Sequence, residues 1–183
     1  MIAARGSRSE KLKTSDSIDR ITDEWRKEFP EIDPIVEGIV SRIHVLAKHF
    51  AKSFDETTQD FGISYPEFQV LKMLRRSGGS YTKSPGQLAE KLHLSSGAMT
   101  NRLDNLEEAG YIERTPDPND RRGVMVTLTD KGDRLFSEAI ERQALKERDL
   151  VSPLPKAERK ELADLLRSLL VNLEEQRGPL KHH

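Results

Sequence analysis

A run of small and polar residues in the middle of the chain has the chemistry to contact a nucleic acid. It begins at the last residue of a three-residue turn, His93–Ser95, and contains no acid before Asp104. Its members are Ser95, Ser96, Gly97, Thr100, Asn101 and Arg102. Small residues let backbone approach phosphates, a helix N-terminus favours anions, and Thr and Asn side chains can contact base edges. The pattern indicates the N-terminal face of a helix that enters the major groove of DNA.

A second candidate contact with nucleic acid, this one basic, lies in the segment DPNDRRG, residues 117–123. Pro, Asn, Asp and Gly predict a tight turn, so Arg121 and Arg122 fall at the tip of a hairpin. An arginine at such a tip can enter the narrow, electronegative minor groove. We expect Asp120 to pair with Arg122 and keep the tip rigid. The alternative is a surface turn whose ion pair is satisfied within itself and contributes little energy.

A helix-turn-helix is the arrangement that would position the first feature. Ser84, Pro85 and Gln87 form a capping signal for a two-turn helix that ends at Leu92. The next helix runs to Ala109, where a glycine supplies a left-handed stop. Such motifs place their second helix in the major groove. An ordinary helical hairpin with a solvated polar face remains the alternative.

The neighbouring segments complete a winged lobe. Ser64 and Glu67 carry another capping signal, for a helix that ends at Gly78. Residues 111–115 and 124–128 form two short strands, and apolar residues alternate in the second. These strands would hold the arginine-tipped turn.

Long amphipathic helices flank this lobe. The segments 17–29, 34–61, 130–148 and 156–176 have helical periodicity. The second of them carries one apolar stripe, formed by Ile35, Ile39, Ile43, Leu46, Phe50, Phe54 and Phe61. A helix this long is hard to bury inside a small domain, so we expect a partner helix to cover it.

The composition fits a helical protein that completes its core by pairing with a second copy. Of 183 residues, 33% are charged and only 5% are aromatic. The net charge of −1 means that a DNA-binding chain must concentrate its basic groups locally. No apolar run is long enough to predict a membrane span, and the polar N-terminus lacks the features of a secretory signal. We therefore expect a cytoplasmic protein without membrane attachment.

Several kinds of chemistry are not indicated. The chain has no cysteine, which excludes disulfides, thiolate nucleophiles and Cys-based zinc sites. His44, His49 and His93 do not form a metal-ligand set, because the spacing of five between the first two does not place both on one helix face. We find no Gly-rich phosphate loop, nucleophile elbow or HExxH motif, and expect no enzyme activity, metal or cofactor.

The order of motifs resembles the MarR family of winged helix-turn-helix regulators. The resemblance is carried by SYPEFQVLKML, PGQLAEKLHLSSGAMTNRLDNLEEAGYIER and DPNDRRGVMVTLTDKG. It implies a mainly α fold with a small β-wing, and a homodimer that grips a pseudo-palindromic operator in double-stranded DNA. Typical members are repressors that a small molecule releases from DNA.

The resemblance also implies a division of the chain. Residues 1–15 would be a disordered arm, and residues 16–63 would serve dimerisation and a ligand cleft. Residues 64–128 would form the DNA-binding lobe. Residues 129–176 would add C-terminal dimerisation helices, and residues 177–183 would be a tail.

The extra N-terminal helix is similar to that of the urate-responsive, PecS-like branch of the family. This similarity assigns ligand-binding roles to Trp25, Arg102 and Arg114, with Gln69 where that branch has an acid and His44 as a further donor. Because the acid is missing, an anionic carboxylate such as aconitate or citrate suits the site better than urate, as in TamR-like regulators. The alternatives are a urate- or phenolic-responsive regulator and an activator that senses no ligand. Trp25 could instead be a core anchor, Arg102 a phosphate contact and Arg114 a solvated strand residue.

Overall fold

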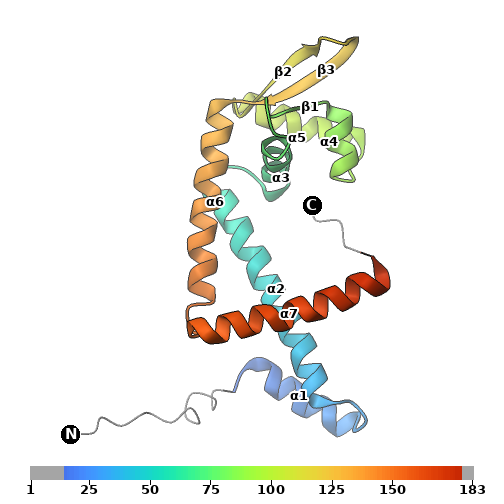
Figure 1. Cartoon of the computed structure of the whole chain (residues 1–183), viewed down its shortest axis with the longest axis vertical. Coiled ribbons are helices and arrows are strands. Elements are labelled where there is room, and N and C mark those ends of the chain that lie inside the picture. Colours follow the sequence, from blue (N-terminus) through green and yellow to red (C-terminus); the bar gives the residue numbers. More distant parts are fainter. Residues whose placement is uncertain (1–14, 179–183) are drawn as a thin grey trace, which may run out of the picture. The chain divides into compact units, whose positions relative to one another are not determined.

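The computed structural model describes residues 15–178 (Figure 1). These residues form two compact units that divide between Lys52 and Ser53. The smaller unit contains α1 (Ser17–Glu28) and most of α2 (Pro34–Asp60). The larger contains the end of α2 and all later elements. The predicted arm lies outside the described residues except for its last residue, and so does the predicted tail from residue 179 onward.

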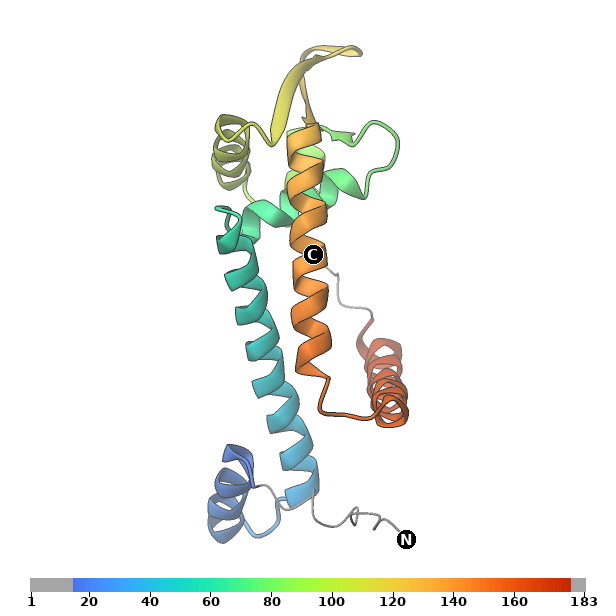
Figure 2. The same ribbon diagram turned by 90° about the vertical axis from the view of Figure 1, so that its left-hand side faces the viewer.

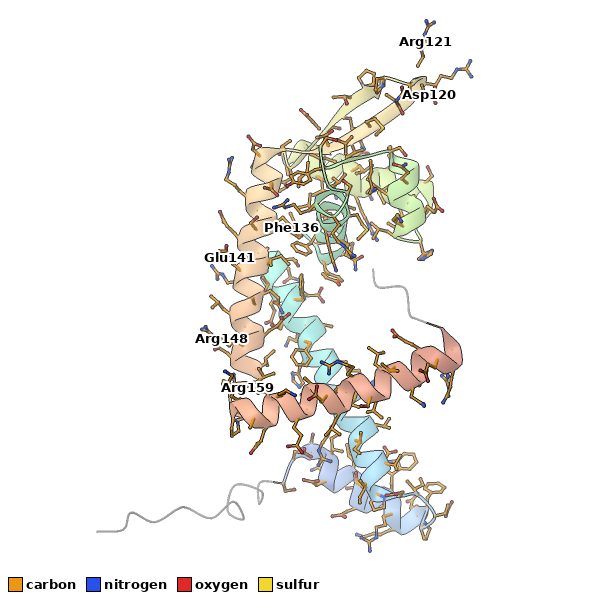
Figure 3. The ribbon with its side chains drawn as sticks, in the orientation of Figure 1. Asp120, Arg121, Phe136, Glu141, Arg148 and Arg159 are labelled. Atoms are coloured by element: carbon orange, nitrogen blue, oxygen red, sulfur yellow. The ribbon has the colours of Figure 1, made fainter. Side chains whose placement is uncertain are left out.

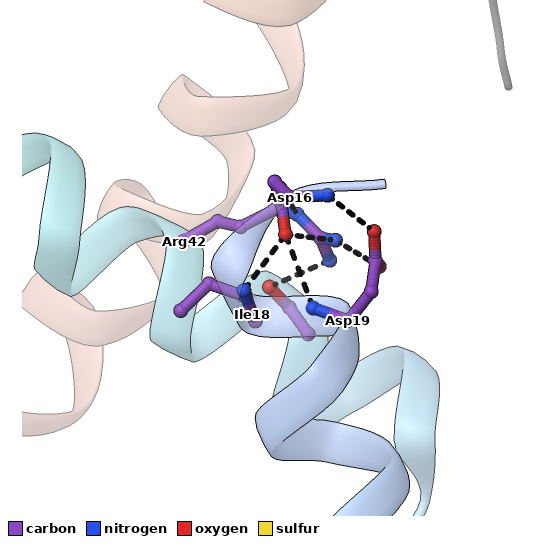
Figure 4. A network of polar contacts seen from close by, with 5 residues as sticks. Asp16, Ile18, Asp19 and Arg42 are labelled. Carbon is purple, nitrogen blue, oxygen red and sulfur yellow. Dashed lines mark hydrogen bonds and ion pairs between the residues drawn. The ribbon is translucent and has the colours of Figure 1, made fainter. Parts of the chain in front are cut away.

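A capping box holds the start of α1 and links it to α2 within the smaller unit. Asp16 accepts backbone N–H groups from Ile18 at 2.8 Å and Asp19 at 3.1 Å, and the Asp19 carboxylate accepts the Asp16 N–H at 2.9 Å. Arg42 of α2 binds both carboxylates, at 2.9 Å and 2.5 Å (Figure 4). Ile18 is buried next to this network. The two helices are therefore held by a polar cluster and a small apolar contact.

The helices of the larger unit begin where the capping signals predicted. Ser64 caps α3 (Tyr65–Arg75), Ser84 caps α4 (Pro85–Lys91), and Ser95 caps α5 (Ser96–Glu108). The first two caps are complete capping boxes, because the Glu or Gln three residues later returns a hydrogen bond. Gly110 follows α5 with a φ of +74°, the left-handed stop expected there.

The sheet has three antiparallel strands in the order β1-β3-β2. They are β1 (Thr82–Lys83), β2 (Ile112–Asp117) and β3 (Asp120–Leu128). The hairpin is longer than predicted, since pairing continues past a bulge at Pro116 to the tip. Pro116 lacks an N–H donor and is tolerated because β2 is an edge strand. Strand β1 was not predicted; it pairs with β3 and its Thr82 hydroxyl lies 2.9 Å from that of Thr127.

One apolar core supports the larger unit. Helix α6 (Asp130–Leu150) follows directly from β3 (Figure 2) and presents Phe136, whose ring stacks on Phe68 of α3 at 5.1 Å. Phe54, at the end of α2, packs edge-on against Phe68. The buried apolar side chains of this core come from the loop before α3, from α3, α4 and its C-cap, α5, the strands and α6: Ile63, Phe68, Val70, Leu71, Met73, Leu74, Leu88, Leu92, Met99, Leu103, Leu106, Ile112, Val126, Leu128, Leu135 and Ala139.

The flanking helices are covered far less. The apolar residues of α2 from Ile35 to Phe50 are mostly exposed, whereas Phe54 and Phe61 pack on the core of the lobe. Helix α7 (Lys156–Arg177) has no buried residue. The predicted fold class, mainly α with a small β-wing, is confirmed. None of the described helices is long and apolar enough to cross a membrane.

Candidate nucleic-acid interface

The first half of α5 presents an exposed, acid-free face. Ser96, Gly97, Thr100 and Asn101 are exposed, and the first turn contains no acid. The hydroxyl of Ser95 accepts the N–H of Ala98 at 3.3 Å. The opposite side of α5 is anchored in the core by its three buried apolar residues, Met99, Leu103 and Leu106. The structure therefore leaves the predicted DNA-binding residues of this helix exposed to solvent, except for Arg102, which is half-buried.

The side chain of Thr100 has a local partner. Its hydroxyl donates to the carbonyl of Ser96 at 2.9 Å, one turn earlier in α5. The residue is exposed, and its hydroxyl oxygen can still accept a hydrogen bond. Thr100 therefore suits contacts with a base amino group or a thymine methyl group.

Arg102 lies on the side of α5 that faces α3. It is half-buried, and its charge acts on the carboxylate of Glu67. Burial alone raises the pKa of Glu67, but hydrogen bonds from Ser64 and Asn105, together with Arg102, lower it below its ordinary value. The amide of Asn105 donates to Glu67 at 2.8 Å. An ionised Glu67 thus links the N-terminus of α3 to the middle of α5.

The wing tip is shaped by its own backbone. Asp120 accepts the backbone N–H of Arg122 at 2.9 Å, and no ion pair joins the two described side chains, so the predicted pairing of their charges is wrong. Asp117 likewise accepts the N–H of Asn119 at 2.8 Å. A Cβ at Gly123 would lie 2.9 Å from the Cβ of Asp117, which explains the glycine. Arg121 and Arg122 are exposed, and Figure 3 shows Arg121 projecting from the tip.

Arg114 connects β2 to α5. Its guanidinium binds Asp104 at 2.8 Å and Glu107 at 2.7 Å, and its backbone N–H donates to Glu107 at 3.2 Å. The pairing of Arg114 with these two acids, a clamp on its guanidinium, was not predicted from the sequence. Arg114 is therefore a half-buried, paired cation that fixes the wing strand to the recognition helix.

The residues predicted to bind a ligand are divided between the two units. Trp25 and His44 belong to the smaller unit and are exposed, and the Trp25 ring stacks on Phe29 at 5.4 Å. Gln69 of α3 is half-buried in the larger unit, which also holds Arg102 and Arg114. Within residues 15–178, no group of three or more His, Asp or Glu side chains is placed to hold a metal ion.

Known proteins share both the sequence and the fold. The MarR family model matches residues 63–124. The chain is 36% identical to the HTH-type transcriptional regulator PecS of Dickeya dadantii, across 80% of this chain and 88% of PecS. A crystal structure of mutant MarR from Escherichia coli superposes with a TM-score of 0.63 at 29% identity, covering 76% of this chain and 98% of MarR.

A second structure of that mutant MarR contains operator DNA. It has a TM-score of 0.55 at 26% identity, and the match covers 80% of this chain and 97% of MarR. Because PecS is this similar along most of its length, the chain belongs to the MarR family of winged helix-turn-helix transcriptional regulators, as its motifs predicted.

Proposed function

We propose that this regulator binds double-stranded DNA with the N-terminal half of α5 in the major groove and the wing arginines in the minor groove. One observation carries the proposal: an exposed, acid-free helix start and an arginine-tipped hairpin belong to the same packed lobe. MarR of E. coli, which has the same fold, is known in complex with operator DNA. The family consists of transcriptional regulators, in agreement with the prediction that the chain is not an enzyme.

Local electrostatics support this mode of binding. The net charge of −1 gives no general attraction to DNA. The positive end of the α5 dipole and the exposed Arg121 and Arg122 supply attraction at the two places where phosphates would lie. Ser95, Ser96 and Gly97 carry no bulky side chain that would keep the helix start away from the DNA backbone.

The proposed unit of binding is a homodimer on a pseudo-palindromic operator. Apolar side chains are exposed on α2 and along α7, and a second copy would cover them. Residues 16–63 and 129–176 would then serve dimerisation on either side of the lobe at 64–128. We propose repression as the outcome, because a bound dimer excludes other proteins from the operator.

We also propose that a small anionic carboxylate, such as aconitate or citrate, releases the DNA. Support comes from the PecS-like and TamR-like sequence pattern at Trp25, Arg102 and Arg114, with Gln69 and His44 as further donors. The contacts of Arg114 add a competition: Asp104 and Glu107 both bind its Nη1, and an anion that binds this guanidinium would compete with them. Loss of these two contacts on ligand binding would free the wing strand from the recognition helix.

The DNA-binding proposal is tested with a duplex selected by the protein itself. Wild-type protein is used to enrich a random duplex library, and the affinity of Arg122→Ala for the enriched duplex is measured by fluorescence anisotropy at several salt concentrations. We expect a loss of about 1–3 kcal/mol and a salt slope smaller by about one. Arg148→Ala is the matched control, because Arg148 is exposed near the far end of α6 (Figure 3). Equal affinity of Arg122→Ala and wild type would remove the wing from the interface.

The ligand proposal is tested by adding aconitate, citrate or urate to the complex with that duplex. Release by the carboxylates in wild type, and blunted release in Arg114→Ala, is the expected result. Asp104→Asn is the control, because it weakens the clamp but leaves the arginine. Release by urate alone, or an unchanged response in Arg114→Ala, would contradict the proposal.

A further inference from the structure

The segment LTDKG, residues 128–132, lies outside the proposed DNA contacts, yet it meets the end of the recognition helix. Thr129 is the N-cap of α6 and accepts the N–H of Gly132 at 3.1 Å. The same hydroxyl donates to the carbonyl of Gly110 at 2.8 Å, and the Thr129 N–H donates to the carbonyl of Tyr111 at 3.1 Å. One residue therefore caps α6 and binds the turn that ends α5.

Lys131 completes the cap of α5 from the first turn of α6. Directly after α5, the N–H of Tyr111 donates to the carbonyl of Leu106 at 2.9 Å and that of Gly110 to the carbonyl of Glu107 at 2.8 Å, which is a Schellman arrangement. The last carbonyl, that of Ala109, accepts from the Lys131 ammonium at 2.7 Å. A cation at the C-terminal end of a helix is also favoured by the helix dipole.

Gly132 brings the two chain segments into close approach. It is buried, and a Cβ on it would lie 2.1 Å from the carbonyl oxygen of Tyr111 and 2.8 Å from a methyl group of Leu128. The nearer obstacle is backbone, so a side chain at residue 132 requires α6 to move away from the start of β2. Glycine is needed here for space, and its own backbone conformation is not left-handed.

We propose that the first turn of α6, Thr129–Gly132, is the joint that sets the orientation of α5 relative to α6, with Lys131 and Gly132 as positioning residues for DNA recognition. The role in recognition rests on the proposed function, whereas the joint itself rests on the contacts above. Helix α6 extends 21 residues from this joint, and its first turn binds the end of the recognition helix and the start of the wing. A displacement of α6 is thereby passed to both DNA-contacting parts at once.

The joint is tested first without DNA. The chain has no cysteine, so spin labels on Ser96→Cys and Arg148→Cys report the distance between the start of α5 and the far part of α6. Labelled protein is diluted with unlabelled chain, so that only distances within one chain are recorded. We expect a narrow distribution in wild type, a shifted or broader one in Lys131→Met and Gly132→Ala, and recovery in Lys131→Arg. Unchanged distributions in both variants would overturn the proposal.

The second measurement is recognition of the enriched duplex compared with a random-sequence duplex. We expect Lys131→Met to bind the enriched duplex about fivefold more weakly, as for loss of one hydrogen bond, and Lys131→Arg to restore binding. Gly132→Ala should lose about tenfold. Affinity for the random duplex and the salt slope should stay unchanged.

A weaker affinity of Lys131→Met for both duplexes, with a salt slope smaller by about one, would mean that Lys131 contacts phosphate and would overturn the positioning role. If Gly132→Ala does not fold, the two Lys131 variants decide the question. If wild type enriches no duplex, the proposed function fails, and the distance measurement still decides whether the joint exists.

Discussion

The winged lobe and the flanking helices use apolar residues in opposite ways. In the lobe, leucines such as Leu74 and Leu103 are at most 1% exposed, whereas Leu165 and Leu169 of α7 are 59% and 50% exposed. The lobe thus closes its core within one chain, with help from α6 and the end of α2, whereas α7 and the first part of α2 leave their apolar side chains exposed. From this difference we expect the stability of the lobe to be intrinsic, and that of α7 and the first part of α2 to depend on protein concentration.

Matched leucine substitutions provide the strongest test of this difference. Leu74→Ala removes a fully buried side chain and should lower the free energy of unfolding by about 2–5 kcal/mol. Leu169→Ala is the same chemical change at a half-exposed site and should cost far less in dilute protein. Denaturant unfolding at two protein concentrations checks both values. A similar loss of unfolding free energy at both sites would show that α7 is packed as tightly as the core of the lobe.

Charges introduced on the exposed leucine face of α7 should weaken dimerisation and leave the stability of the lobe unchanged. Replacing both Leu165 and Leu169 with Glu should weaken dimerisation by about 1–3 kcal/mol per residue, because an unpaired polar group would be buried at the interface. Sedimentation equilibrium measures this effect. The double variant Asn172→Glu and Gln176→Glu adds the same charge to α7 at exposed polar positions and should stay dimeric. Equal dissociation of the two double variants would contradict an apolar interface on the leucine face.

Backbone strain in the lobe should appear at any protein concentration. His93, in the turn between α4 and α5, has a φ of +51°, a conformation that costs a side-chain-bearing residue about 1–2 kcal/mol. His93→Gly should therefore raise the free energy of unfolding by up to about 1 kcal/mol. Gly110→Ala, at a φ of +74°, should lower it by about 1 kcal/mol. Thermal unfolding checks both signs, and a loss of stability in His93→Gly would mean that side-chain contacts outweigh the strain.

The mildest effect is expected at the polar cluster of α1. Arg42 lowers the pKa of the Asp16 carboxyl, and the Asp16 N–H together with Arg42 lowers that of Asp19. The stabilisation they provide is therefore present above the unfolded pKa of about 4 and is lost as pH falls through the lowered folded values.

Trp25 is the single tryptophan and lies on α1, so its fluorescence reports on the helix whose start this cluster holds. Acid titration should change its emission, and Arg42→Met should reduce that change. Arg20→Met, also on α1, is the control. The same acid transition in Arg42→Met and wild type would exclude the cluster as its cause.

Local signals in the sequence predicted most of the fold. Caps at Ser64, Ser84 and Ser95 are short-range features, so the starts of α3, α4 and α5 could be predicted. Strand β1 could not, because its two residues have no periodicity and are defined only by pairing with β3. The full length of the hairpin was also missed, since turn-forming residues near the tip continue to pair across the strands.

The site was predictable in composition but not in its contacts. The exposed face of α5 and the wing arginines follow from residue type and spacing. The pairing of Arg114 with Asp104 and Glu107 depends on how β2 folds back beside α5, which no local pattern specifies. The contact of Lys131 with the end of α5 is also tertiary, although a Lys-Gly pair after a capping Thr marks the place where it occurs.

The most direct test of the central claim is the stoichiometry on DNA. Sedimentation velocity of the full chain with the enriched, fluorescently labelled duplex at low ionic strength gives the number of chains on each duplex. We expect two chains per duplex, bound through paired flanking helices with one lobe in each half-site. A single chain per duplex, or no comigration with double-stranded DNA, would contradict it.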